Sequence, residues 1–93
     1  MANVQQVQRV TADGITAVAF PNNSGSWLVK NYSSADIYVS FEPTVAPETS
    51  IKIASGMGQV CVISTKYGEQ GQPKTDTIYI NGNGEVEVQQ LWV

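Results

Sequence analysis

The sequence predicts an all-β fold: a single antiparallel β-sandwich of about eight short strands, jelly-roll-like or immunoglobulin-like. Three observations predict it. Apolar and polar residues alternate with a period of two over residues 36–42, as they do in a half-buried strand. Gly, Asn and Pro recur between the apolar segments, and no segment shows a helical period. A partly open barrel is the alternative architecture.

The N-terminal quarter of the chain is expected to form two strands. Valines recur at a spacing of three within residues 1–13, and we interpret this segment as an edge strand or an N-terminal arm. The dipeptide Asp13-Gly14 is a strong hairpin signal. It leads into a second strand at 15–20, and the polar segment 21–26 follows as a loop.

Two strands, 27–32 and 36–42, are expected in the centre of the chain. A hairpin between them would turn at residues 33–36, and the side chain of Asn31 is suited to set that turn. The next segment, 43–49, contains two prolines. Because proline cannot donate to a strand ladder, we expect this segment to cross between two sheets.

The next part of the chain repeats the pattern of short strand and turn. Strands are expected at 51–54 and 59–65, with a glycine-containing turn at 55–58 between them. The polar segment 67–74 is interpreted as a surface loop. A further strand follows at 76–80, in which alternate isoleucines point inward.

The last strand is expected at 85–93, after a hairpin turn at Asn81-Gly82-Asn83-Gly84. Asn and Gly supply the positive φ that such turns need. Val86 and Val88 share a face, but Leu91 and Val93 fall on the other. Either a bulge at Gln89-Gln90 or a strand end covered on both faces would explain this change of phase.

The strand phases predict which side chains form the core. Phe41 is among them, and Phe41→Ala should lower the free energy of unfolding by about 3–5 kcal/mol. Cys61, the only cysteine, cannot form an internal disulfide and is expected to pack as an inert apolar residue. The residues predicted to be buried with it are Ile37, Val39, Phe41, Ile51, Ile53, Val60, Val62, Ile78, Ile80, Val86 and Val88.

Length and composition indicate one domain, residues 1–93, with a net charge of −3. The five basic residues are spread singly along the chain, which argues against nucleic-acid binding because phosphate recognition needs clustered cations. The N-terminus lacks the pattern of a signal peptide, and no apolar run is long enough for a membrane span. Synthesis and folding in a cytoplasm are therefore expected.

The sequence offers no catalytic, cofactor-binding or metal-binding residues, so we expect no enzyme and no cofactor. Histidine is absent, which excludes a Ser-His-Asp triad and removes the usual zinc ligands. Glu85 and Glu87 share a strand face, but their alternation with valines is typical of a solvated sheet face. The glycine-rich turns lack the lysine and the following helix of a phosphate-binding loop.

Four large side chains are candidate interface residues. Leu91 and Trp92 form an apolar C-terminus, and Tyr38 and Tyr79 occupy outward positions of their strands. Exposed aromatic residues anchor protein interfaces, and they equally stack on sugar rings. The competing interpretations are ordinary cross-strand pairs for the tyrosines, and a Trp92 that folds back over its own sandwich.

Three segments together resemble small β-sandwich proteins encoded by tailed bacteriophages near their capsid genes. They are 27–32 continuing into 36–41, then 50–56, and 78–80 with the following turn and 84–88. The resemblance implies a virion part made in the host cytoplasm: a head decoration, a head fibre, or a tail or collar protein. It also implies a homo-oligomer of three or more copies that docks onto a capsid or tail protein. A small carbohydrate-binding or adhesion module is the alternative function, with a glycan as its partner.

Overall fold

The computed structural model describes residues 6–63 and 75–91, and these form strands but no helix. The prediction of an all-β antiparallel fold is therefore confirmed. The number of strands is smaller than predicted, because two pairs of expected strands are continuous. The six strands are β1 (Gln6–Ser24), β2 (Ser26–Asn31), β3 (Ile37–Ser40), β4 (Ile51–Ile53), β5 (Gly58–Val62) and β6 (Thr75–Gln90).

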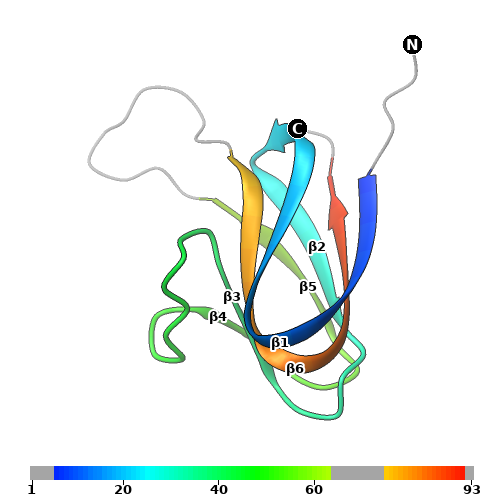
Figure 1. Ribbon diagram of the computed structural model, residues 1–93, viewed down its shortest axis with the longest axis vertical. Helices are drawn as coiled ribbons and strands as arrows, with labels where there is room; N and C mark the ends of the chain where they lie inside the picture. The colour runs from blue at the N-terminus through cyan, green and yellow to red at the C-terminus, as the bar shows by residue number, and fades with distance from the viewer. Residues whose placement is uncertain (1–5, 64–74, 92–93) are drawn as a thin grey trace.

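All six strands belong to one antiparallel sheet, which curves into an open, barrel-like shape (Figure 1). The order along the sheet is β4-β3-β6-β2-β5, and β1 pairs with β6 along the opposite edge of that strand. The first half of β6 pairs with β3 and the second half with β2. One long strand therefore connects two halves of the sheet, where the sequence predicted two separate sheets.

The two strong turn signals of the sequence lie opposite each other inside β1 and β6. Gly14 is the direct partner of Gly82. The paired strands β1 and β6 bend together at the lower end of the molecule in Figure 1. Gly14 has φ 72° and Gly84 has φ 131°. The predictions of hairpin turns at Asp13-Gly14 and at residues 81–84 are therefore wrong. The glycines instead allow a long two-stranded ribbon to bend around the core.

The connections between strands differ from the predicted ones. β6 lies between β2 and β3, so these two strands form no hairpin. β3 pairs directly with β4, so the proline-containing segment 43–49 joins neighbouring strands and does not cross between sheets. The predicted turn between β4 and β5 is confirmed: the Met57 amide donates to the Ala54 carbonyl at 3.0 Å.

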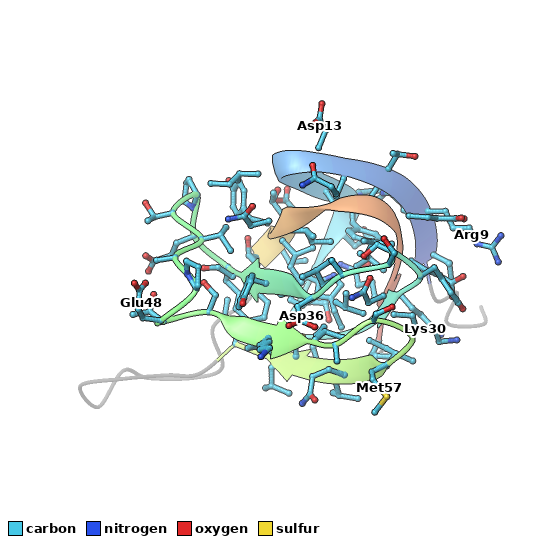
Figure 2. All side chains as sticks on the ribbon, turned by 90° about the horizontal axis from the view of Figure 1, so that it is seen from below. Arg9, Asp13, Lys30, Asp36, Glu48 and Met57 are labelled. Atoms are coloured by element: carbon cyan, nitrogen blue, oxygen red, sulfur yellow. The ribbon has the colours of Figure 1, made fainter. Side chains whose placement is uncertain are left out.

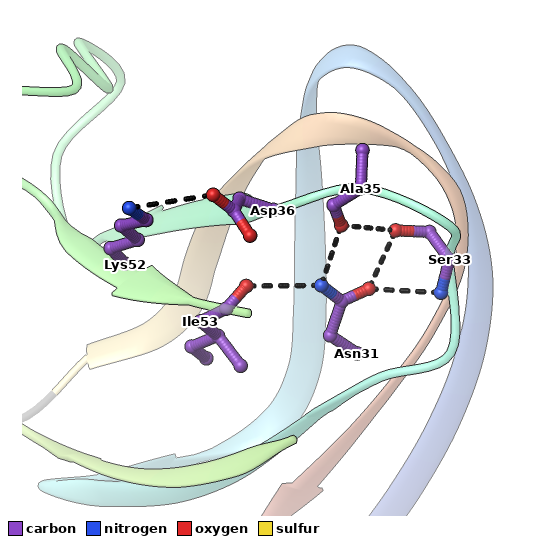
Figure 3. A network of polar contacts seen from close by, with 6 residues as sticks. All are labelled: Asn31, Ser33, Ala35, Asp36, Lys52 and Ile53. Carbon is purple, nitrogen blue, oxygen red and sulfur yellow. Dashed lines mark hydrogen bonds and ion pairs between the residues drawn. The ribbon is translucent and has the colours of Figure 1, made fainter. Parts of the chain in front are cut away.

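Asn31, at the end of β2, organises the connection to β3 through its buried side chain, as the sequence predicted (Figure 3). Its Nδ2 donates to the carbonyls of Ala35 at 2.8 Å and Ile53 at 3.0 Å. Its Oδ1 accepts from the backbone amide and the hydroxyl of Ser33, at 2.9 and 2.6 Å. Beside this network, Lys52 and Asp36 form an ion pair at 3.4 Å. One amide side chain thus holds the 33–36 turn against β4.

The core lies inside the curve of the sheet and confirms most of the predicted buried set. Trp27 is fully buried, and its ring centroid lies 5.4 Å from that of Phe41. Phe41 and Ile51 are only partly buried, so the Phe41 prediction overstated its burial. The fully or almost fully buried apolar side chains are Ala12, Val18, Phe20, Trp27, Val29, Ile37, Val39, Ile53, Cys61, Ile78, Ile80, Val86 and Val88.

The burial predicted for Val60 and Val62 is wrong, because these side chains are 50% and 55% exposed. Both flank Cys61, whose side chain is the one that points into the core. A strand presents alternate residues to opposite faces. The polar Gln59 shares the phase of the buried Cys61, so the sequence pattern marks the wrong face of this strand as the outer one.

The C-terminal half of β6 keeps its alternation as far as Gln90. Its pairing with β1 and β2 continues through Gln89 and Gln90 without a shift of register, so of the two explanations that the sequence left open, the bulge is wrong. Gln90 points inward and is 6% exposed, and its Nε2 donates to the Asn22 carbonyl at 2.6 Å. The apparent change of phase arose because the inward position at residue 90 holds a polar side chain.

Candidate interaction surfaces

The strand register divides the outward side chains into two surfaces, because directly paired residues share a face of a sheet. The first, which we call the tyrosine face, lies over β4, β3, the first half of β6 and the second half of β1. The second, which we call the valine face, lies over the first half of β1, the second half of β6, β2 and β5. Both surfaces are backed by the buried core, so the positions of their side chains are fixed by the fold.

The tyrosine face holds two of the candidate interface residues. Tyr38 is the direct partner of Asn81, and Tyr79 is the direct partner of Ser40. Because Tyr79 and Asn81 are two residues apart on β6, the tyrosines are diagonal neighbours across two strands. Both side chains are half-buried. The structure therefore brings the two predicted aromatic residues together on one outer surface.

The chain itself covers part of the tyrosine face. Asn81 Nδ2 donates to the Val45 carbonyl at 3.2 Å, and this bond holds the segment between β3 and β4 over the outer side of the sheet. Val45 is 3% exposed but does not belong to the core cluster. Val45 is therefore buried outside the core, beside Asn81 on the outer side of the sheet.

The valine face carries three apolar side chains that are each about half exposed. One row crosses four strands and consists of Val7, Gln89, Leu28 and Val60. Val7 is 51% exposed and Val60 is 50% exposed. The next outward position along β5, Val62, is 55% exposed. The sequence pattern missed this surface because it assigned both valines of β5 to the core.

A charged row borders the valine face (Figure 2). Arg9 Nε donates to Glu87 Oε1 at 3.0 Å, and Lys30 Nζ lies 3.6 Å from Glu87 Oε2. The hydrogen bond to Glu87 raises the pKa of Arg9 above its ordinary value. The Glu87 side chain is only 12% exposed, so it is covered by its two cationic partners and is not the solvated residue that the sequence predicted.

The C-terminal candidate Leu91 lies on the valine face. Its amide donates to the Ser26 carbonyl at 3.0 Å, and its carbonyl accepts from Ser24 Oγ at 2.9 Å. Ser26 is in turn the direct partner of Val62. Leu91 and Val62 are therefore separated by one small residue in the same row. The other C-terminal candidate, Trp92, lies outside the described residues.

Cys61 has the environment of an unreactive thiol. The side chain is fully buried, and burial raises its pKa from 9.0 to about 12. The sulfur donates to the Gln59 carbonyl at 3.7 Å. The thiolate is the nucleophilic form of cysteine. Because the raised pKa keeps Cys61 protonated at neutral pH, its reactivity is low.

Two searches for particular features within residues 6–63 and 75–91 gave negative results. These residues contain no group of three His, Cys, Asp or Glu side chains that could hold a metal ion. Nor do they form a helix long and apolar enough to cross a membrane.

A scan of protein-family models and searches of curated proteins and solved structures found no match for this chain. Function is therefore inferred from the chain's own surfaces.

Proposed function

We propose that the protein is a structural component that acts by self-association and by docking onto a larger protein assembly. The observation that carries this proposal is the valine face, where Val7, Val60 and Val62 are each about half exposed and Leu91 lies in the same surface. Contiguous exposed apolar groups on a small domain mark contact sites more often than scattered single ones do.

The surroundings of the valine face have the composition of a contact surface. Gln89 and Ser26 lie between the apolar side chains, and the Arg9–Glu87–Lys30 row borders them. An apolar centre with a polar and charged border is the usual anatomy of protein interfaces. Arg9 is 66% exposed in its side chain, which leaves its guanidinium accessible to an acidic group of a partner.

The specific role that we propose is that of a virion component of a tailed bacteriophage, attached to a capsid or tail protein. The support is the resemblance of three segments to such proteins, together with a polar, weakly charged composition with few reactive side chains. An oligomer of three or more copies is part of this proposal. So is the participation of Leu91 and Trp92 in the contact.

A carbohydrate-binding role is the second candidate, and the diagonal placement of Tyr38 and Tyr79 on one outer surface favours it. Two adjacent aromatic rings can stack on a glycan. Glycan-array binding that disappears with Tyr38→Ala would support this role. Absence of glycan binding by a stable oligomer would instead favour the structural role.

Light scattering after size exclusion, on the full chain and on a chain ending at Gln90, tests the proposal. We expect the full chain to be oligomeric at tens of micromolar, and truncation to weaken the oligomer because Leu91 lies in the valine face. Tyr38→Ala serves as the control, since its side chain lies on the other surface. A full chain that remains monomeric across this range would contradict self-association.

A further inference from the structure

The described sheet has three free edges, and two of them carry the features by which proteins protect edges from pairing. β4 is only three residues long and presents the charged Lys52. β1 is bent and carries charged side chains. A hydrogen bond also joins the parts of β1 before and after Gly14, since Gln8 Nε2 donates to the Ala19 carbonyl at 2.6 Å. Neither edge offers a straight, uncharged strand to a partner.

The third edge, that of β5, has none of these protections. The strand reads Gly-Gln-Val-Cys-Val and contains neither a charged residue nor a proline. Its other side pairs with β2 over all five residues. Within the described part of the chain, no strand pairs with its outer side. By the rules that govern edge strands, β5 is open to pairing.

Two hydrogen bonds fix which residues of β5 face the open edge. The Asn31 amide donates to the Met57 carbonyl and the Ile63 amide donates to the Gly25 carbonyl, both at 2.9 Å. In an antiparallel pair, backbone groups alternate between the two sides of a strand. Residues 59 and 61 therefore bond to β2, and the amides and carbonyls of Gly58, Val60 and Val62 point to the open edge.

We propose that β5 pairs antiparallel with β5 of a second copy of the chain, about a two-fold axis at Val60. This inference rests on the proposed self-association and names one contact through which it would occur. Val60 would lie opposite Val60 of the second copy, and Gly58 opposite Val62, in both directions. All three residue pairs then exchange backbone hydrogen bonds, about six in total.

A second copy suits this edge better than a foreign strand for two reasons. An antiparallel strand is complementary to itself under two-fold symmetry, so the same residues supply both sides of the contact. The chain carries a net charge of −3, but the nearest charged side chains of the valine face, Lys30 and Glu87, are one and two strands away from the edge. No like charges would therefore oppose each other.

The side chains at the edge also fit this register. Val60 would extend its row with Leu28 into the same row of the second copy. Val62 would lie beside Gly58, which has no side chain to obstruct it. A contact of five residues a side is smaller than a standard protein interface, so we expect a dimer of roughly micromolar affinity. Larger assemblies would need a second contact.

Proline at residue 60 tests the pairing selectively. It removes an amide that points to the open edge but none that bonds to β2, and edge strands tolerate proline at such positions. We expect Val60→Pro to keep its fold by circular dichroism and to weaken dimerisation about tenfold or more in sedimentation equilibrium. Val60→Thr retains the amide and the branched shape, and should dimerise nearly as the parent does.

Val7→Lys distinguishes edge pairing from face-to-face packing, because Val7 lies in the same row but on β1. We expect this variant to dimerise as the parent does. If Val7→Lys and Val60→Pro weaken dimerisation equally, edge pairing is overturned. Undiminished dimerisation of a folded Val60→Pro would overturn it as well, while leaving self-association intact. A parent chain that stays monomeric at tens of micromolar overturns both. If Val60→Pro fails to fold, Val62→Pro removes a neighbouring open amide and is judged by the same outcomes.

Discussion

Gly14 and Gly82 lie directly opposite each other in the pairing of β1 with β6. A methyl group added to Gly82 would meet Ile37 Cγ2 at 2.6 Å, whereas one added to Gly14 would meet nothing within 4 Å. The two glycines therefore serve different needs. Gly82 leaves room for the start of β3, and Gly14 supplies a backbone conformation with φ 72°.

This difference predicts unequal costs for the two alanine substitutions. Gly82→Ala should lower the free energy of unfolding by about 2–3 kcal/mol, because Ile37 is buried and cannot move aside cheaply. Gly14→Ala should lower it by about 1 kcal/mol, the conformational cost alone. Urea unfolding of both variants measures the difference. Equal costs would show that steric room beside Ile37 is not what Gly82 provides.

The bend of β1 and β6 also shows how far the sequence could predict the fold. Alternation identified β2, β3, β4 and most of the core, because one face of each strand is marked by polar residues. The sequence predicts hairpin turns at Asp13-Gly14 and at residues 81–84. A turn and a sharp bend within a strand both require positive φ and a missing side chain, so the same residues fit either structure. Only the pairing of the two segments separates these possibilities, and pairing is a tertiary property.

Asn31 should be among the polar residues whose substitution destabilises the domain most. Asn31→Ala would remove one hydrogen bond from each of the Ile53 carbonyl and the Ser33 amide, and would leave the Ala35 carbonyl with its bond from Ser33 Oγ. We expect a loss of about 3 kcal/mol in the free energy of unfolding. Asn83→Ala is the matched control, because Asn83 makes a single exposed bond to the Gly14 amide. A small effect of Asn31→Ala would show that the turn forms without this side chain.

Burial of Cys61 has a consequence at alkaline pH. Its folded pKa, about 12, lies above the ordinary value of 9.0, so the unfolded chain loses the thiol proton first. The contribution of the protonated Cys61 thiol to the free energy of unfolding is therefore complete below pH 9. Between pH 9 and 12 it declines by about 1.4 kcal/mol per pH unit. Cys61→Ala should show a shallower decline in thermal melts over that range.

The same burial should protect the thiol at neutral pH. We expect a thiol reagent to label native Cys61 far more slowly than the chain unfolded in denaturant. Rapid labelling of the native protein, or a pH dependence identical to that of Cys61→Ala, would place the thiol outside the core.

The candidate surfaces were only partly predictable. The tyrosines could be placed on an outer face because inward isoleucines and valines fix the phase of their strands. Val60 and Val62 could not, since the polar Gln59 shares the phase of the buried Cys61 and therefore marks the wrong face as the outer one. Leu91 was recognised as unusual, but its place beside Val62 depends on β2 lying between β6 and β5.

Amide hydrogen exchange at Val60 tests the central claim most directly, because this amide points to the open edge of β5. The Cys61 amide, which bonds to β2, is the internal control and should be protected at every protein concentration. We predict that exchange at Val60 is fast in dilute protein and slows as concentration rises and copies pair through β5. Exchange at Val60 that is independent of concentration, whether fast or slow, would contradict the account.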